Sequence, residues 1–119
     1  MPRRLAALLL ALAPASLTAG EVEITGVHAR EARGGWTFSV TLRHGDTGWD
    51  HYADAWRVKG PDGTVFGTRT LLHPHVQEQP FTRSLSGVRI PEGVTEVVIE
   101  ARDTVHGWAK TTYPVTLPR

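Results

Sequence analysis

The chain contains no cysteine, and its only methionine is Met1. Without thiols it can form no disulfide, no cysteine-ligated zinc site, no blue-copper centre and no iron–sulfur cluster. A cysteine nucleophile and a copper site built from several methionines are excluded for the same reason. The lipobox cysteine of lipoproteins is missing too, so we expect no lipid anchor. The hydrophobic core alone must therefore hold the fold together.

Helical patterns and enzyme signatures are also missing. After Glu21 no segment carries a helical apolar stripe of useful length, and Pro74, Pro80 and Pro114 disfavour helix further. The chain has no G-x-S-x-G nucleophile motif, no phosphate-binding loop and no dinucleotide fingerprint. A single small domain also seldom provides the cleft that a glycosidase with paired carboxylates needs. We therefore expect a protein without catalytic activity.

The first 19 residues are typical of a secretory signal peptide. A basic start with two arginines precedes an apolar run over Leu5–Ala13, and small residues allow cleavage after Ala15 or after residue 19 or 20. The apolar run is shorter than the roughly 20 residues that cross a membrane. We expect residues 1–19 to be removed, which leaves one domain, 20–119, without a transmembrane anchor. The mature protein is then periplasmic or secreted.

An excess of either charge is absent from the mature chain. Two of the 13 Lys and Arg residues lie in the predicted signal peptide, so 11 remain against 12 Asp and Glu, a formal charge of −1. A near-neutral surface offers no electrostatic attraction to nucleic acid or to an anionic membrane. We therefore expect no nucleic-acid partner.

What the chain does have is a series of short segments in which apolar and polar residues alternate, separated by turn signals. This pattern predicts an all-β, seven-strand antiparallel sandwich of immunoglobulin-like or fibronectin-III-like form. Trp36 in the core, with no disulfide beside it, favours the fibronectin-III-like form. The predicted strands are Val22–His28, Trp36–Arg43, Ala53–Lys59, Thr64–Leu72, Phe81–Val88, Glu96–Asp103 and a last strand through Tyr113, Val115 and Leu117.

Three distinctive strings lie between Trp49 and Trp108: WDHYADAWRV, LLHPHVQEQPFTRSL and ARDTVHGW. Through them the chain resembles a family of small exported bacterial proteins of unassigned function. The resemblance implies export and brings no known activity with it. Any function must therefore be argued from the residues themselves.

Five of the six histidines fall in connections that should meet at one end of the sandwich. Successive strands run up and down, so the connections after the second, fourth and sixth strands share a pole. These are His44–Tyr52, His73–Pro80 and Thr104–Lys110. The other three connections are ordinary turns, EARGG, GPDGT and IPEGV, and we expect them at the opposite pole together with a solvated His28.

The His73-Pro74-His75 pair is the strongest signal for a metal site. Residues two apart in an extended segment project the same way, so both imidazoles can reach one ion. With His51 and His106 from the neighbouring loops, the set suits Zn²⁺ or Cu²⁺ in a nitrogen and oxygen environment. Asp103 should point inward beneath them and hold an imidazole.

Other interpretations of these residues stay open. The histidines can serve as structural hydrogen-bonders, and we expect His44 to be solvated. Trp49, Tyr52 and Trp108 can form a recognition surface or pack the loops, and packing is favoured for Phe81. Arg69 and Arg83 are expected to pair with Asp54 or Asp103.

Three functions agree with these residues. The first is an exported, non-catalytic binding module with Zn²⁺ or Cu²⁺ held by His51, His73, His75 and His106. The second is a metal-free protein-interaction or envelope-assembly domain that uses Trp49 and Trp108 as anchors. The third is a small metalloenzyme with an open coordination position. A copper brace is excluded because the predicted mature chain does not begin with histidine, and the ligand spacing of copper–zinc superoxide dismutase does not match.

Overall fold

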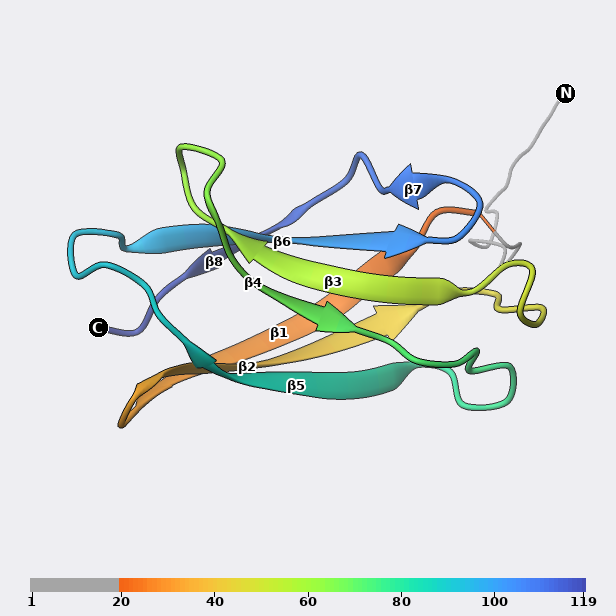
Figure 1. Ribbon diagram of the computed structural model, residues 1–119, viewed down its shortest axis with the longest axis horizontal. Helices are drawn as coiled ribbons and strands as arrows, with labels where there is room; N and C mark the ends of the chain where they lie inside the picture. The colour runs from red at the N-terminus through yellow and green to blue at the C-terminus, as the bar shows by residue number, and fades with distance from the viewer. Residues whose placement is uncertain (1–19) are drawn as a thin grey trace, which may run out of the picture.

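The structure, a computed structural model, describes residues 20–119, so the predicted signal peptide lies outside it. The described chain forms eight antiparallel strands in two sheets and contains no helix, as expected of an all-β protein (Figure 1). No helix long and apolar enough to cross a membrane occurs in this part of the chain. The strands are β1 (Glu23–Ala32), β2 (Gly35–Arg43), β3 (Ala53–Lys59), β4 (Val65–Thr70), β5 (Phe81–Val88), β6 (Glu96–Asp103), β7 (Gly107–Trp108) and β8 (Tyr113–Thr116).

The two sheets differ in size. One has the order β1-β2-β5, and the other has the order β4-β3-β6-β7, with β8 also paired to β6. We predicted seven strands, and the structure has eight because a short strand, β7, lies in the predicted connection Thr104–Lys110. β7 pairs with the end of β6 directly after the turn at 104–106, and β8 pairs with its beginning. The predicted last strand is β8, and β7 is an additional strand that was expected to be part of a loop.

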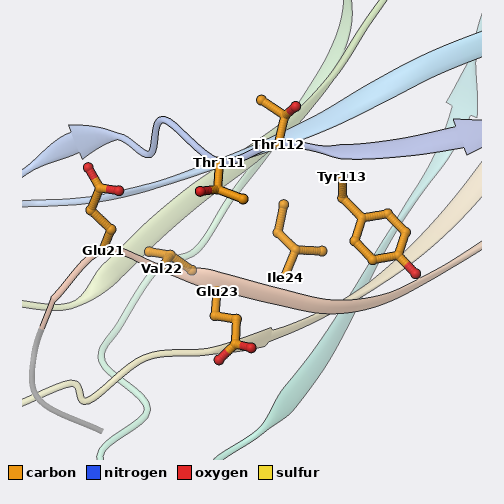
Figure 2. A pocket seen from close by; sticks show the side chains of 7 residues that line it. All are labelled: Glu21, Val22, Glu23, Ile24, Thr111, Thr112 and Tyr113. Atoms are coloured by element: carbon orange, nitrogen blue, oxygen red, sulfur yellow. The ribbon is translucent and has the colours of Figure 1, made fainter. Parts of the chain in front are cut away.

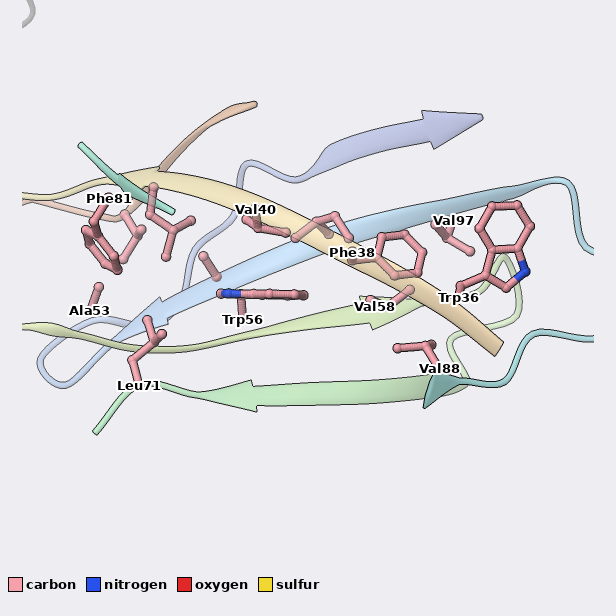
Figure 3. Packing of buried hydrophobic residues seen from close by; sticks show 14 of the residues in the cluster. Trp36, Phe38, Val40, Ala53, Trp56, Val58, Leu71, Phe81, Val88 and Val97 are labelled. Atoms are coloured by element: carbon pink, nitrogen blue, oxygen red, sulfur yellow. The ribbon is translucent and has the colours of Figure 1, made fainter. Parts of the chain in front are cut away.

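The core lies between the sheets and follows the predicted alternation. Trp36, Phe38, Val40 and Leu42 on β2 are at most 1% exposed and face the other sheet. They pack against residues of β3 and β6, among which Trp56 is fully buried (Figure 3). Burial of one such side chain contributes about 1.5–3 kcal/mol. The other core members on β3 and β6 are Ala53, Val58, Val97, Ile99 and Ala101.

The outer side of β2 is polar in the same regular way. Three pairs of hydroxyl side chains join β2 to β5 across the surface of the three-stranded sheet. They are Thr37 with Ser86, Ser39 with Ser84, and Thr41 with Thr82. The alternation of the sequence thus separates a dry face from a hydroxyl-lined face on one strand.

β1 is longer than predicted. It continues to Ala32, and the hairpin turn takes only Arg33 and Gly34. Gly34 and Gly35 have φ of 86° and 137°, which a residue with a side chain rarely adopts, so the tight turn depends on glycine. His28 therefore lies within β1 rather than at its end, and it is exposed as expected.

The predicted separation of the connections is confirmed. The connections after β2, β4 and β6 lie at one end of the sandwich, at the right of Figure 1, and the three Gly- and Pro-containing turns lie at the other. We call the first end the loop pole and define it as residues 44–52, 71–80 and 104–106. Gly20, the first described residue, lies at this end as well, because its backbone contacts the ring of His44.

Candidate metal centre

The inward side of β2 continues past the end of the strand. Val40 and Leu42 alternate into the core, and His44 and Asp46 keep the same even-numbered parity. Their relative exposures are 3% and 6%, so both are buried. The expectation that His44 is solvated is wrong, because the alternation of β2 extends into the loop. The same parity was visible in the sequence and would have identified both residues.

β6 brings a carboxylate to the same place. Asp103 ends the strand on the inward side, after Ile99 and Ala101, and it is fully buried as its parity predicts. Its Oδ1 accepts the backbone N–H groups of Val105 at 2.8 Å and of His106 at 2.7 Å. These two bonds orient the carboxylate and leave Oδ2 for other partners.

Three imidazoles surround this carboxylate. His51 Nε2 lies 3.1 Å from Oδ1 of Asp103, and His106 Nδ1 lies 3.1 Å from both oxygens. His44 Nε2 lies 3.7 Å from Oδ2. The rings touch one another, with centroids 4.8 Å apart for His44 and His51 and 5.1 Å apart for His51 and His106. Residues from two connections, 44–52 and 104–106, thus meet around one buried acid.

His44 is held between two carboxylates. Its Nδ1 is hydrogen-bonded to Asp46, which also accepts the backbone N–H of Ala53 at 3.1 Å and that of His75 at 2.7 Å. Its Nε2 is buried without a hydrogen-bond partner and faces Asp103. A buried ring nitrogen opposite a carboxylate oxygen is stabilised by a cation between them, either a proton on the ring or a metal ion.

The charges of this group favour such a cation. Burial lowers the pKa of His44, but the hydrogen bond to Asp46 and the charges of Asp46 and Asp103 outweigh burial and raise it above 6.5. Burial raises the pKa of Asp103, whereas the backbone N–H groups and His106 lower it below the ordinary value. Both carboxylates are therefore ionised near neutral pH and attract a positive charge to the space between them.

The donor atoms are spaced as metal ligands are. One donor atom each from His44, His51 and Asp103 lies within 4.8 Å of the others. For zinc bonds of about 2.0–2.1 Å, tetrahedral geometry places two ligand atoms about 3.3 Å apart. His51 Nε2 lies 3.1 Å from Oδ1 of Asp103 and His44 Nε2 lies 3.7 Å from Oδ2, so the two separations involve different oxygens of the carboxylate. Small movements of side chains would bring all three to one ion.

The four histidines predicted as ligands are divided into two pairs. His51 and His106 lie at Asp103, whereas the rings of His73 and His75 lie together with centroids 4.7 Å apart. Among the described residues, the group of converging donor atoms does not include His73, His75 or His106. Their role as ligands stays a prediction.

His73 and His75 have other contacts. His75 stacks on Phe81 with ring centroids 3.9 Å apart, and its Nε2 lies 3.0 Å from Nη2 of Arg83. Since a guanidinium only donates, Nε2 accepts and Nδ1 carries the proton, which leaves His75 no free lone pair. Burial and the charge of Arg83 lower the pKa of His75, in keeping with a neutral ring. His73 is exposed and contacts the carbonyl of Pro74 through Nδ1, 3.0 Å away.

The arginine pairs differ from those expected. Arg83 pairs with Glu78 at 3.1 Å, and Arg69 donates to backbone carbonyls. Asp54 instead pairs with Arg102 at 2.8 Å. Asp103 has histidine partners, so the expected arginine pair with it is wrong. The sequence shows which residues are charged but not which strands are neighbours, and β3 pairs with β6 rather than with β5.

The three aromatic candidates lie in two environments. Trp49 is 69% exposed at the loop pole and packs edge-on against Tyr52, with ring centroids 5.6 Å apart. Trp108 lies on β7, where the guanidinium of Arg57 covers its ring at 3.7 Å. Trp49 is therefore available to a partner, whereas the strand residue Arg57 occupies one face of Trp108.

No protein-family model matches the chain, and no solved structure matches it. Among curated proteins it is similar to a protein of Halomicrobium mukohataei named "Putative lipoprotein", with 49% identity over 71 residues. The match covers 60% of this chain and 34% of that protein, so the chain spans about a third of its relative's length. The relative's name describes an exported protein and gives no activity. The similarity is in line with the predicted resemblance to exported proteins of unassigned function.

Proposed function

We propose that this chain is an exported binding module that holds a divalent transition-metal ion at its loop pole. The ligands are His44 Nε2, His51 Nε2 and Asp103 Oδ2. The observation that carries the proposal is the buried Nε2 of His44, which has no hydrogen-bond partner and faces a buried carboxylate 3.7 Å away. An ion at this point would satisfy both groups at once.

The chemistry of the donors suits Zn²⁺ or Cu²⁺. Two imidazoles and one carboxylate form a nitrogen and oxygen set that both ions accept, and the chain offers no thiolate that would favour another metal. Asp46 holds the Nδ1–H of His44, as carboxylates do for metal-bound histidines in general. Asp46 and Asp103 together offset the two positive charges of the ion.

His106 is the candidate for a fourth ligand. Its Nδ1 already lies 3.1 Å from Asp103, and its side chain is 38% exposed, so the ring is free to turn. A site closed by His106 would be non-catalytic, whereas a site with water in this position would resemble those of metalloenzymes. We propose the first arrangement, because no catalytic signature accompanies the histidines in the sequence.

The fold class and the location belong to the same proposal. Strand order β1-β2-β5 in one sheet and β4-β3-β6 in the other, with β8 along β6, supports an immunoglobulin-like or fibronectin-III-like sandwich. The predicted signal peptide and the name of the lipoprotein relative support export to the periplasm or beyond. The second candidate function, a metal-free interaction domain, is favoured by the exposed Trp49 at the same pole.

The test is metal analysis of the protein expressed with its leader, together with titration of Zn²⁺ and Cu²⁺ into the stripped protein. We expect close to one ion per chain, lost in His51→Ala and retained in the control His28→Ala. The double variant H73A/H75A separates the two histidine pairs. Retention of metal in H73A/H75A supports the site at Asp103. Loss of metal in H73A/H75A together with retention in His51→Ala would show that His73 and His75 are the ligands instead. Absence of metal from the unmodified chain, with no change in melting on adding either ion, overturns the proposal.

A further inference from the structure

Exposed apolar side chains gather at the loop pole. Five large hydrophobic residues of the described chain are exposed, and four of them lie on the three loops of this end. They are Trp49 at 69%, Leu72 at 77%, Val76 at 54% and Val105 at 58%. The fifth, Val65, lies on β4. Exposed apolar residues scattered singly need no explanation, but residues gathered at one end of a domain indicate a contact surface.

The loops that carry these residues are fixed to one another. Thr104 donates its N–H to the carbonyl of Tyr52 at 3.0 Å and its hydroxyl contacts the carbonyl of Asp50 at 3.5 Å. The N–H of His75 donates to the side chain of Asp46 at 2.7 Å. Each loop is thereby bonded to another loop. The loops are therefore fixed relative to one another, with little ordering left to occur on binding.

The surface consists of protruding tips rather than a hollow. The pocket of about 350 Å³ in Figure 2 is lined by the start of β1 and the segment that leads into β8, and none of its lining residues belongs to the three loops. Four separate side chains, each more than half exposed, do not form a groove with a defined shape. A fluid environment such as a lipid bilayer can surround each of them without a matching shape. Trp49 with Tyr52 is also the kind of aromatic pair found where apolar and aqueous phases meet.

The point at which the chain enters the domain supports a lipid bilayer as this fluid environment. Gly20 lies at the loop pole beside His44, so the chain enters the domain at this end. The residues before Gly20 include the apolar run Leu5–Ala13. A precursor engaged by that run at a membrane would bring the loop pole, and not the opposite turns, next to the bilayer.

We infer that the loop pole docks on the surface of a lipid bilayer, with Trp49, Leu72, Val76 and Val105 entering the boundary between headgroups and acyl chains. The binding is apolar in character. The exposed Glu78 is paired with Arg83, and the mature chain is close to neutral, so anionic lipid adds little. This inference is independent of the metal and stands for the stripped protein as well.

The test is co-sedimentation of residues 20–119 with vesicles of phosphatidylcholine, with and without phosphatidylglycerol. We expect binding to both vesicle types with little dependence on salt, and a blue shift of tryptophan emission that disappears in Trp49→Phe. The double variant Leu72→Ser with Val76→Ser should bind at least about tenfold more weakly, because two apolar anchors are lost. Substitutions of exposed residues leave the fold intact, which circular dichroism verifies.

Val65→Ser is the matched control, since it removes an exposed valine away from the loop pole. Equal loss of vesicle binding in the control and in the pole variant overturns the inference. So does a lack of vesicle binding by the unmodified chain. If that chain instead forms dimers that the pole variant abolishes, the occupant of the surface is a second copy and the lipid assignment is wrong.

Discussion

His44 Nε2 lies 3.7 Å from Oδ2 of Asp103, although His44 follows β2 in one sheet and Asp103 ends β6 in the other. The two sheets of the sandwich therefore meet through polar groups at the loop pole and through apolar groups elsewhere. A cation between these atoms would also join the sheets. Binding of a cation between His44 and Asp103 and the stability of the fold should therefore change together.

Addition of the preferred ion should stabilise the folded state. A ligand that binds only the native protein adds about 2.7 kcal/mol to the free energy of unfolding when its free concentration is 100 times Kd. We expect urea denaturation of the stripped chain to shift accordingly with Zn²⁺ or Cu²⁺. Magnesium, which prefers oxygen ligands, serves as the control ion and should have no such effect. An equal shift with magnesium would contradict binding through the imidazoles.

Asp46→Asn should weaken metal binding without removal of a ligand. Asp46 holds Nδ1 of His44, and loss of such a supporting carboxylate typically reduces affinity by about 10–100-fold. Calorimetric titration measures the change. Asp62→Asn, in the exposed turn between β3 and β4, provides the control. A variant at Asp46 that binds as tightly as the unmodified chain would show that His44 is not a ligand.

The stability of the metal-free protein should fall as the pH rises through neutrality. The pKa of His44 is raised in the folded state, so its imidazolium stabilises the fold fully below about 6.5, the unfolded value. That contribution is lost as the pH rises through the higher folded pKa. We expect the melting temperature in a chelator to decrease from pH 6 to pH 9, and less so in His44→Gln. Metal affinity should change in the opposite direction, because only the neutral ring binds an ion.

Arg57→Ala should destabilise the larger sheet. Arg57 covers the ring of Trp108 at 3.7 Å and pairs with Glu100 at 2.7 Å, with both partners of the pair mostly buried. Loss of the stacking and of the pair should cost about 1–2 kcal/mol of unfolding free energy. Arg30→Ala, on an exposed position of β1, should change it by less than about 0.5 kcal/mol. Equal effects of the two substitutions in urea denaturation would show that the contacts of Arg57 contribute nothing.

Phe38→Ala should bring the chain close to unfolding. Phe38 is fully buried between the sheets, and truncation of a buried phenylalanine costs about 3–5 kcal/mol. The free energy of unfolding of a domain of this size is about 5–15 kcal/mol in total. This domain has no disulfide that would limit the loss of stability. Loss of cooperative thermal unfolding is the expected observation. Normal melting of the variant would mean that the core repacks around the cavity.

The sequence predicted the strands and the poles because both depend on local patterns. Alternation identified the buried side of β2, and turn residues marked the end to which each connection belongs. The site depended on continuation of that alternation beyond the strand. His44 was expected in solvent because it follows Arg43 in a polar string, although its parity with Leu42 already pointed inward.

The pairing of side chains between strands that are distant in the sequence could not be predicted in the same way. The partners of Asp54 and Arg83 depend on which strands are neighbours, and the alternation of a single strand carries no such information. For the same reason the four predicted histidines could be assigned to one end but not to one centre. Their division into pairs follows from Asp103 and Phe81, which lie beside different loops.

The hydroxyl pairs between β2 and β5 have a consequence for the orientation of the domain. Each hydroxyl is hydrogen-bonded to its partner on the other strand. The surface that they form is polar and presents no apolar side chain to a bilayer. A domain with such a surface has little reason to lie on its side. It would contact the bilayer through the loop pole, with its carboxyl terminus at the opposite end of the sandwich (Figure 1).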